Sequence, residues 1–150
     1  MLIAGGNSYV GLSDHTRSVR KTWLLNPSTG DLVNGTDMKR SKSDHACTVF
    51  EDKVYVVAVK EAETEVFDPA TGNWSAGPTF PFPPGEEGSL AVIDNTLVFR
   101  TTYRTQFLKR NGTGTLEWKK AYHVGTGDDF KPLAKIISLK FDNSCNLVFP

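Results

Sequence analysis

An eight-residue pattern that occurs twice limits the fold of this 150-residue chain more than any other feature. Residues 25–32 (Leu-Asn-Pro-Ser-Thr-Gly-Asp-Leu) and 67–74 (Phe-Asp-Pro-Ala-Thr-Gly-Asn-Trp) start 42 residues apart, and a looser third copy occupies residues 108–118. A second pattern, in residues 47–55 and 90–98, repeats after 43 residues. Such a period is typical of folds that stack one supersecondary unit on the next.

The repeated unit consists of short apolar segments joined by turns. Glu51-Asp52-Lys53 and Asp94-Asn95-Thr96 supply residues that bond their own backbone and tolerate a left-handed conformation, which predicts tight hairpins between the flanking strands. In residues 68–72, Pro69 presets the turn and Gly72 supplies a positive φ before the next strand. Each period therefore holds two hairpins, or four antiparallel strands, which is the content of one propeller blade.

The remaining segments also favour strands. They are three to six residues long and rich in Val, Ile, Phe and Tyr, which suit a pleated surface. Residues 58–65 are the best helical alternative, but a helix there would have almost nothing apolar to bury. We predict an all-β chain.

The chain resembles the kelch-repeat family at several of these positions. Residues 2–6 (Leu-Ile-Ala-Gly-Gly) are similar to a second blade strand with its double glycine, and residues 40–45 resemble the polar approach to a first strand. Tyr55-Val-Val-Ala58, Glu65-Val-Phe-Asp68-Pro69 and Asn73-Trp74 resemble a nearly complete blade. Val59-Lys60 and Arg100-Thr101 replace the expected double glycines, and the third copy lacks Asp-Pro, so the repeat is degenerate.

The resemblance implies a kelch-like β-propeller segment with an incomplete ring. We expect about three four-stranded antiparallel blades, in residues 1–44, 45–88 and 89–133, and a partial blade with an extra strand in residues 134–150. Propellers usually close with four to eight blades. The chain is then an excerpt of a longer gene product, a truncated product without a role of its own, or a unit that self-associates through open blade edges.

Charge and hydropathy exclude two classes of partner. Seventeen basic residues balance seventeen acidic ones, so the excess of Lys and Arg that nucleic acids require is missing. The longest apolar stretch, residues 54–59, is far shorter than the ~20 residues that cross a bilayer. We expect neither nucleic-acid binding nor a membrane span.

No motif predicts catalysis, a metal or a cofactor. Asp44, His45 and Cys47 lie close in sequence, but an inner strand of small packed residues explains them better than a nucleophilic site. The three histidines lack ligand spacing. The alternative is a fragment of a kelch-propeller enzyme, such as a copper radical oxidase, whose catalytic residues lie outside this chain.

The cysteines and sequons bear on the compartment. Cys47 and Cys145 are 98 residues apart, which favours two reduced thiols over a bridge. Asn34, Asn73 and Asn111 begin Asn-x-Ser/Thr sequons, which would be used in an extracellular protein. Asn also suits turns in any compartment, so a cytoplasmic location stays open.

Binding is the remaining function, and the topology predicts where it occurs. In an antiparallel blade, the second-to-third connections and the connections between blades emerge on one face, and loops on rigid scaffolds carry function. Aromatic and arginine side chains, which are enriched in interface hot spots, occur in these connections. The predicted binding residues are Tyr9, Arg17, Arg40, Phe80, Phe82, Tyr103 and Arg104, with His15 and Met38 beside them.

We therefore expect a non-catalytic module that presents these loops to a protein partner. For residues 80–84 (Phe-Pro-Phe-Pro-Pro), an equal alternative is a rigid connector that packs against the blades.

Overall fold

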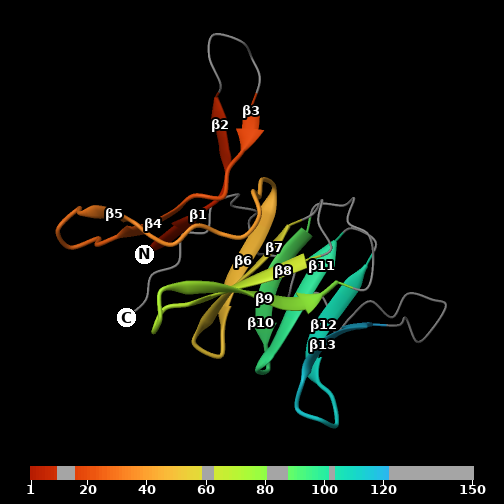
Figure 1. Ribbon diagram of the computed structural model, residues 1–150. Coiled ribbons are helices and arrows are strands. Elements are labelled where there is room, and N and C mark those ends of the chain that lie inside the picture. The colour runs from red at the N-terminus through yellow and green to blue at the C-terminus, as the bar shows by residue number, and fades with distance from the viewer. Residues whose placement is uncertain (10–15, 59–62, 81–87, 102–103, 122–150) are drawn as a thin grey trace.

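The computed structural model describes residues 1–9, 16–58, 63–80, 88–101 and 104–121 (Figure 1). These residues form thirteen strands, all paired antiparallel, and no helix. The all-β prediction is confirmed. No helix that could cross a membrane occurs in the described part of the chain.

The first sheet has three described strands and carries a separate hairpin. Its strand order is β1-β4-β5, from β1 (Leu2–Ala4), β4 (Thr22–Leu25) and β5 (Leu32–Asn34). Between β1 and β4 the chain forms a two-stranded hairpin, β2 (Asn7–Tyr9) with β3 (Thr16–Ser18), which projects away from the sheets (Figure 1).

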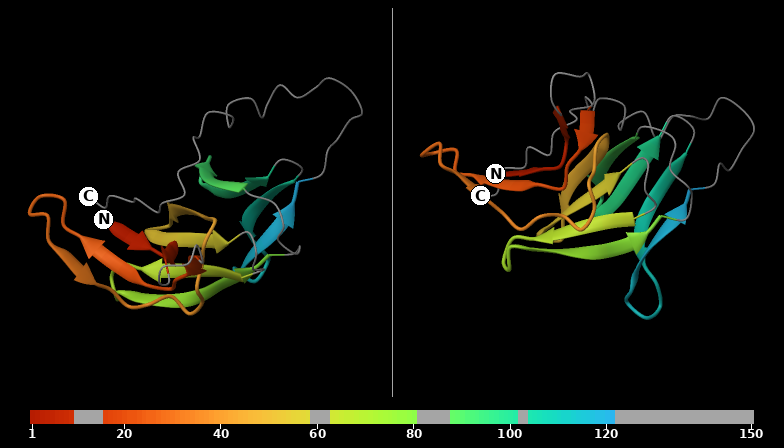
Figure 2. Two further views of the ribbon diagram at one scale, coloured as in Figure 1. Left: turned by 90° about the horizontal axis from the view of Figure 1, so that it is seen from above. Right: turned by 45° about the horizontal axis from the view of Figure 1, so that its top comes forward.

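The second and third sheets each have four strands in sequence order. The second contains β6 (His45–Phe50), β7 (Lys53–Ala58), β8 (Glu63–Asp68) and β9 (Asn73–Thr79). The third contains β10 (Gly88–Ile93), β11 (Thr96–Thr101), β12 (Thr105–Arg110) and β13 (Leu116–Lys120). Figure 2 shows the three sheets stacked one after another. Between the second and third sheets, β6 contacts β10 and β9 contacts β13.

Two predicted hairpins have the expected turn geometry. Phe50 pairs with Lys53, and Ile93 pairs with Thr96, so each turn has two residues. Glu51 and Asp52 have φ values of 48° and 59°, and Asp94 and Asn95 have 47° and 55°. Positive φ at both central positions matches the right-handed twist of the flanking strands. The predicted left-handed turns are confirmed.

The turns before β5 and β9 also repeat their chemistry. The Asn26 and Asp68 side chains each accept a hydrogen bond from a backbone N–H two residues later, at 3.0 and 2.9 Å. Gly30 and Gly72 each donate a 2.8 Å bond back to the carbonyl of that Asn or Asp. Gly72 has a φ of 69°, as its position in the repeat predicts.

The second sheet buries both of its faces, as its central strand shows. Val54 and Val56 of β7 pack in a cluster with Leu2, Met38 and Trp74, between the first and second sheets. Their neighbours Tyr55 and Val57 point the opposite way, into a cluster with Phe99, Leu108 and Trp118 of the third sheet. Side chains alternate along a strand, so β7 supplies the centre of two cores.

The helical alternative for residues 58–65 is wrong where the structure describes them. Ala58 ends β7, and Glu63–Asp68 forms β8 with four consecutive buried residues. A strand covered by sheets on both faces needs no alternating polar pattern, and this explains why Thr64 and Glu65 are buried beside Val66 and Phe67.

Tryptophans of the fourth strands bond one sheet to the preceding one. Trp74 Nε1 donates to Thr22 Oγ1 at 3.2 Å and to the Thr36 carbonyl at 2.9 Å. Trp118 Nε1 donates to Thr64 Oγ1 at 3.1 Å. Thr22 and Thr64 occupy the same position of the repeat, three residues before Leu25 and Phe67. The repeat therefore specifies the contact between sheets as well as the strands.

The rest of the fold prediction extends past the described residues. No closed ring of sheets forms among the described residues, which agrees with an incomplete propeller. The partial blade expected in residues 134–150 lies outside the description. The kelch assignment stays a prediction.

We expect Trp74→Phe to lower the free energy of unfolding by about 1–3 kcal/mol, because it leaves the buried Thr22 hydroxyl and the Thr36 carbonyl without their shared donor. Trp118→Phe is the matched variant, since it removes one such bond and should cost less. Urea unfolding measures both. Equal stability of Trp74→Phe and the wild type would contradict this role.

Candidate binding surface

The connections emerge at two ends of the sheets. Turns at residues 26–31, 51–52, 69–72, 94–95 and 111–115 form one end. The other connections leave from the opposite strand ends, at residues 5–21, 35–44, 59–62, 80–87 and 102–104. We call this second end the loop end; it is the end at which binding was predicted.

The connection from the first to the second sheet, residues 35–44, packs tightly at the loop end. The Met38 N–H donates to the Arg20 carbonyl at 2.9 Å, and Val19 forms an isolated bridge with Lys42. The Gly6 N–H donates to the Lys42 carbonyl at 2.8 Å. A Cβ on Gly5, whose φ is 70°, would lie 2.8 Å from that carbonyl, so the double glycine admits this close approach.

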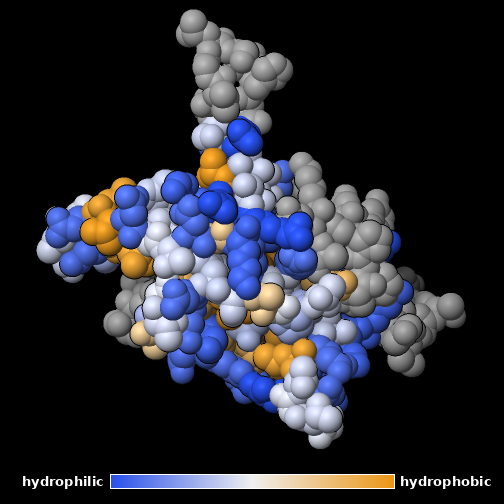
Figure 3. Space-filling model, in the orientation of Figure 1, coloured by the Kyte–Doolittle hydropathy of each residue, from blue (hydrophilic) through white to orange (hydrophobic). Residues whose placement is uncertain are grey.

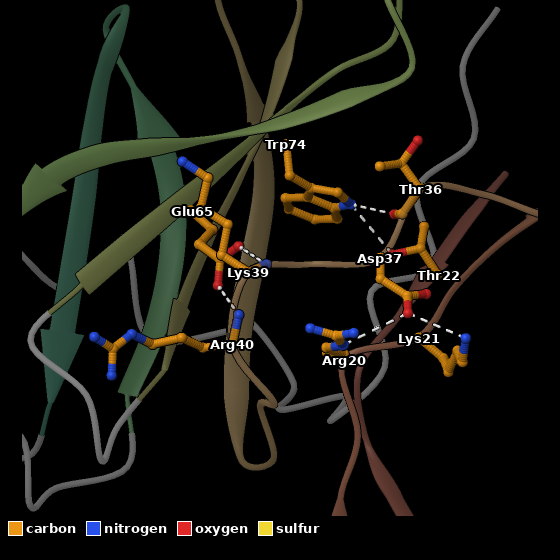
Figure 4. Close-up of polar contacts among 9 residues, drawn as sticks. All are labelled: Arg20, Lys21, Thr22, Thr36, Asp37, Lys39, Arg40, Glu65 and Trp74. Atoms are coloured by element: carbon orange, nitrogen blue, oxygen red, sulfur yellow. Dashed lines mark hydrogen bonds and ion pairs between the residues drawn. The ribbon is translucent and has the colours of Figure 1, made fainter.

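Glu65 holds this connection in place from the second sheet (Figure 4). One carboxylate oxygen accepts the Lys39 N–H at 2.7 Å, and the other accepts the Arg40 N–H at 3.2 Å. Lys42 Nζ lies 3.4 Å from the same carboxylate, and the Lys42 and Glu65 side chains are 0% and 2% exposed. A buried charge needs such partners, so Glu65 fixes the backbone that carries Lys39 and Arg40.

His45 lies buried at the start of β6, where the connection ends. Neither ring nitrogen makes a hydrogen bond of ordinary geometry with a described residue. Burial lowers the pKa of His45 from its ordinary value, and the nearby Lys42 charge lowers it further. The Ala4 backbone and the Asp44 charge raise this pKa, but by less than burial lowers it. The imidazole is therefore neutral at pH 7 and packs against the glycine turn, since a Cβ on Gly5 would lie 3.0 Å from its Cε1.

Exposed cations gather around this fixed connection. Asp37 Oδ2 lies 3.0 Å from Lys21 Nζ and 3.6 Å from Arg20 Nε, and Arg40 Nε lies 2.8 Å from Glu63 Oε2. Figure 3 shows hydrophilic side chains over this part of the surface. We call the exposed cations the basic cluster; its members are Arg20, Lys21, Lys39 and Arg40.

The structure divides the predicted binding residues. Arg40 is exposed in this cluster, Arg17 is exposed on β3 of the projecting hairpin, and Arg104 is exposed between β11 and β12. Tyr9 ends β2, whereas Phe82 and Tyr103, and His15 beside the predicted site, lie outside the described residues.

Two of the predicted loop side chains are buried. Phe80 packs between the second and third sheets, 5.0 Å from the Phe99 ring and 4.6 Å from the Trp118 ring. Phe80 therefore packs against the sheets, as the alternative of a rigid connector predicts for this residue. Met38 is also buried, in the cluster between the first and second sheets, and is not displayed on the loop face.

The three sequon asparagines differ in their surroundings. Asn34 and Asn73 are exposed. The Asn111 side chain holds its own turn, because its oxygen accepts the Thr113 and Thr115 N–H groups at 3.0 Å and its amide donates to Glu117. The Asn111 amide is therefore already engaged within the fold.

The prediction of reduced thiols is wrong for Cys47, which is disulfide-bonded. Large sequence separation does not prevent a bridge, because a fold brings distant strands together. Cys145 lies outside the described residues. No group of three His, Cys, Asp or Glu side chains that could hold a metal occurs in the part of the chain that the structure describes.

Sequence reasoning missed the polar core of this surface. Glu65 and Lys42 lie in segments that were expected to be a strand and a polar approach, and neither was identified as buried. The signal was available in part, because Thr64-Glu65 interrupts an apolar strand that two neighbouring sheets must cover.

Comparison with known proteins does not assign the chain. No family model matches it, and no curated protein matches it.

We expect Glu65→Gln to lower the free energy of unfolding by about 3–5 kcal/mol, because the buried Lys42 charge loses its counter-ion. Glu63→Gln, two residues away and 49% exposed, is the matched control and should cost less than about 1 kcal/mol. Chemical denaturation of both variants measures the difference. Similar costs at the two positions would show that Glu65 does not fix the connection.

Proposed function

We propose that this chain is a non-catalytic protein-binding module whose loop end binds an acidic segment of a partner protein. The observation that carries the proposal is the basic cluster, because two of its members, Lys39 and Arg40, lie on a backbone segment fixed by a buried carboxylate. A fixed backbone lowers the entropy lost when a partner orders the interface.

The chemistry of the partner follows from the charges at the loop end. Asp37 and Glu63 neutralise only part of the cluster, because Arg20 and Lys21 share Asp37. The Lys39 side chain has no ion-pair partner among the described residues. Arginine forms bidentate pairs with carboxylates, and complementary charge accelerates association. A run of Asp and Glu residues fits this surface.

The balanced net charge of the whole chain supports a local surface over a general polyanion site. Cations at the turn end are paired within the fold: Lys53 Nζ lies 2.9 Å from Asp68 Oδ2, and Arg110 bonds Glu51. The positive potential is therefore confined to the loop end. Salt screens it, because the side chains of the basic cluster are exposed.

A labelled ten-residue polyglutamate peptide tests this proposal by fluorescence anisotropy at low salt. We expect the wild-type chain to bind it, Lys39→Ala with Arg40→Ala to weaken binding at least about tenfold, and 0.5 M salt to abolish it. Lys53→Ala with Arg110→Ala removes the same charge from the turn end and should leave the affinity unchanged.

Two results would overturn the proposal. One is equal loss of affinity in the two double variants, which would indicate a response to net charge alone. The other is tighter binding of a DNA oligonucleotide of equal charge than of the peptide, which would indicate a nucleic-acid site.

A further inference from the structure

Two apolar sheet faces at opposite ends of the stack belong to neither of the two hydrophobic clusters. On the first sheet, Ile3 pairs with Trp23, and Leu25 pairs with Leu32, which places these side chains on the face directed away from the second sheet. Leu2 and Leu24 point the other way, into the cluster with Val54 and Trp74. No described strand packs on the outward face, and Leu32 is 56% exposed.

The third sheet has a corresponding open face. Val98 pairs with Phe107, and both point away from Leu97, Phe99 and Leu108, which face the second sheet. Ala91 pairs with Val98 and therefore lies on the same open face. Ile93 is two residues further along β10, so it lies on this face too. These side chains are half-buried, and none is a member of a described cluster.

The repeat shows what each open face is built to contact. Leu25 and Leu32 stand where Phe67 and Trp74 stand in the second sheet, and that pair packs on the preceding sheet. Ile93, Val98 and Phe107 stand where Phe50, Tyr55 and Val66 stand, and those three pack on the following sheet. Thr105 stands where Thr64 accepts the Trp118 N–H.

We infer that the chain associates head to tail, with the open face of the first sheet of one copy packed on the open face of the third sheet of a second copy. This contact repeats the geometry that already joins the first sheet to the second and the second to the third. When two copies use it reciprocally about a two-fold axis, six sheets close a ring, within the usual range of four to eight.

The exposure of Leu32 on β5 supports this occupant. Figure 3 shows a hydrophobic patch over this strand, where Leu32 is 56% exposed. Large exposed apolar patches mark interaction sites, and in an unpartnered edge they promote aggregation. Leu32 replaces the inward tryptophan of the next repeat, so a third sheet placed over it would bury this side chain as Trp74 is buried.

Sedimentation equilibrium of the 150-residue chain tests the inference. We expect twice the 16.5 kDa chain mass for the wild type and a single chain mass for Leu32→Glu and for Phe107→Glu, because either change places a charge in both contacts of the ring. Val33→Glu is the matched control: it is equally exposed and on the opposite side of β5, so it should stay dimeric.

Mixing the two monomeric variants distinguishes head-to-tail from face-to-face association. A Leu32→Glu chain keeps its third-sheet face and a Phe107→Glu chain keeps its first-sheet face, so the mixture should regain a dimer with one intact contact. Circular dichroism confirms that both variants are folded. A monomeric wild type would overturn the inference and indicate that another part of the chain covers these faces. A mixture that stays monomeric, or dimers of either single variant, would also overturn it.

Discussion

A sheet with two apolar faces is the constraint on which the rest of this structure depends. Val54 and Val56 face the first sheet, and Tyr55 and Val57 face the third, so the central strand of the second sheet is stable only between two neighbours. Trp74 and Trp118 then fix the spacing between neighbouring sheets, because the indole N–H of each donates to a threonine of the preceding sheet. In the second and third repeats, two kinds of residue thus determine the stacking: alternating apolar side chains and one tryptophan donor.

The polar junction at the loop end follows from the same stacking. Connecting two sheets requires residues 35–44 to cross the strand ends, and Glu65 satisfies two of the backbone N–H groups that this crossing would otherwise leave unpaired. The buried Lys42 neutralises Glu65 from the connection itself. A structural requirement therefore rigidifies the segment that carries Lys39 and Arg40 of the basic cluster, and this joins the architecture to the proposed binding of acidic partners.

Sequence reasoning predicted the features that depend on local chemistry. The left-handed hairpin turns at residues 51–52 and 94–95 and the positive φ of Gly72 follow from side-chain type and spacing alone. The burial of Phe80 and Met38 depends on which sheet lies opposite, which no single repeat specifies. The Lys42–Glu65 pair was missed for the same reason, because its partners are 23 residues apart, one in the connection between two sheets and the other in β8.

Native-state hydrogen exchange of β7 tests most directly the claim that its two covered faces hold the stack together. In the β7–β8 ladder, we expect the amides of the Val54–Phe67 and Val57–Thr64 pairs to exchange only when the whole fold unfolds. The free energy of their exchange should then equal the free energy of unfolding measured by chemical denaturation. The amides of β5 and β13 should exchange through smaller openings. Exchange of β7 at a lower free energy than β13 would contradict the account, because the central strand would then open without separating the sheets.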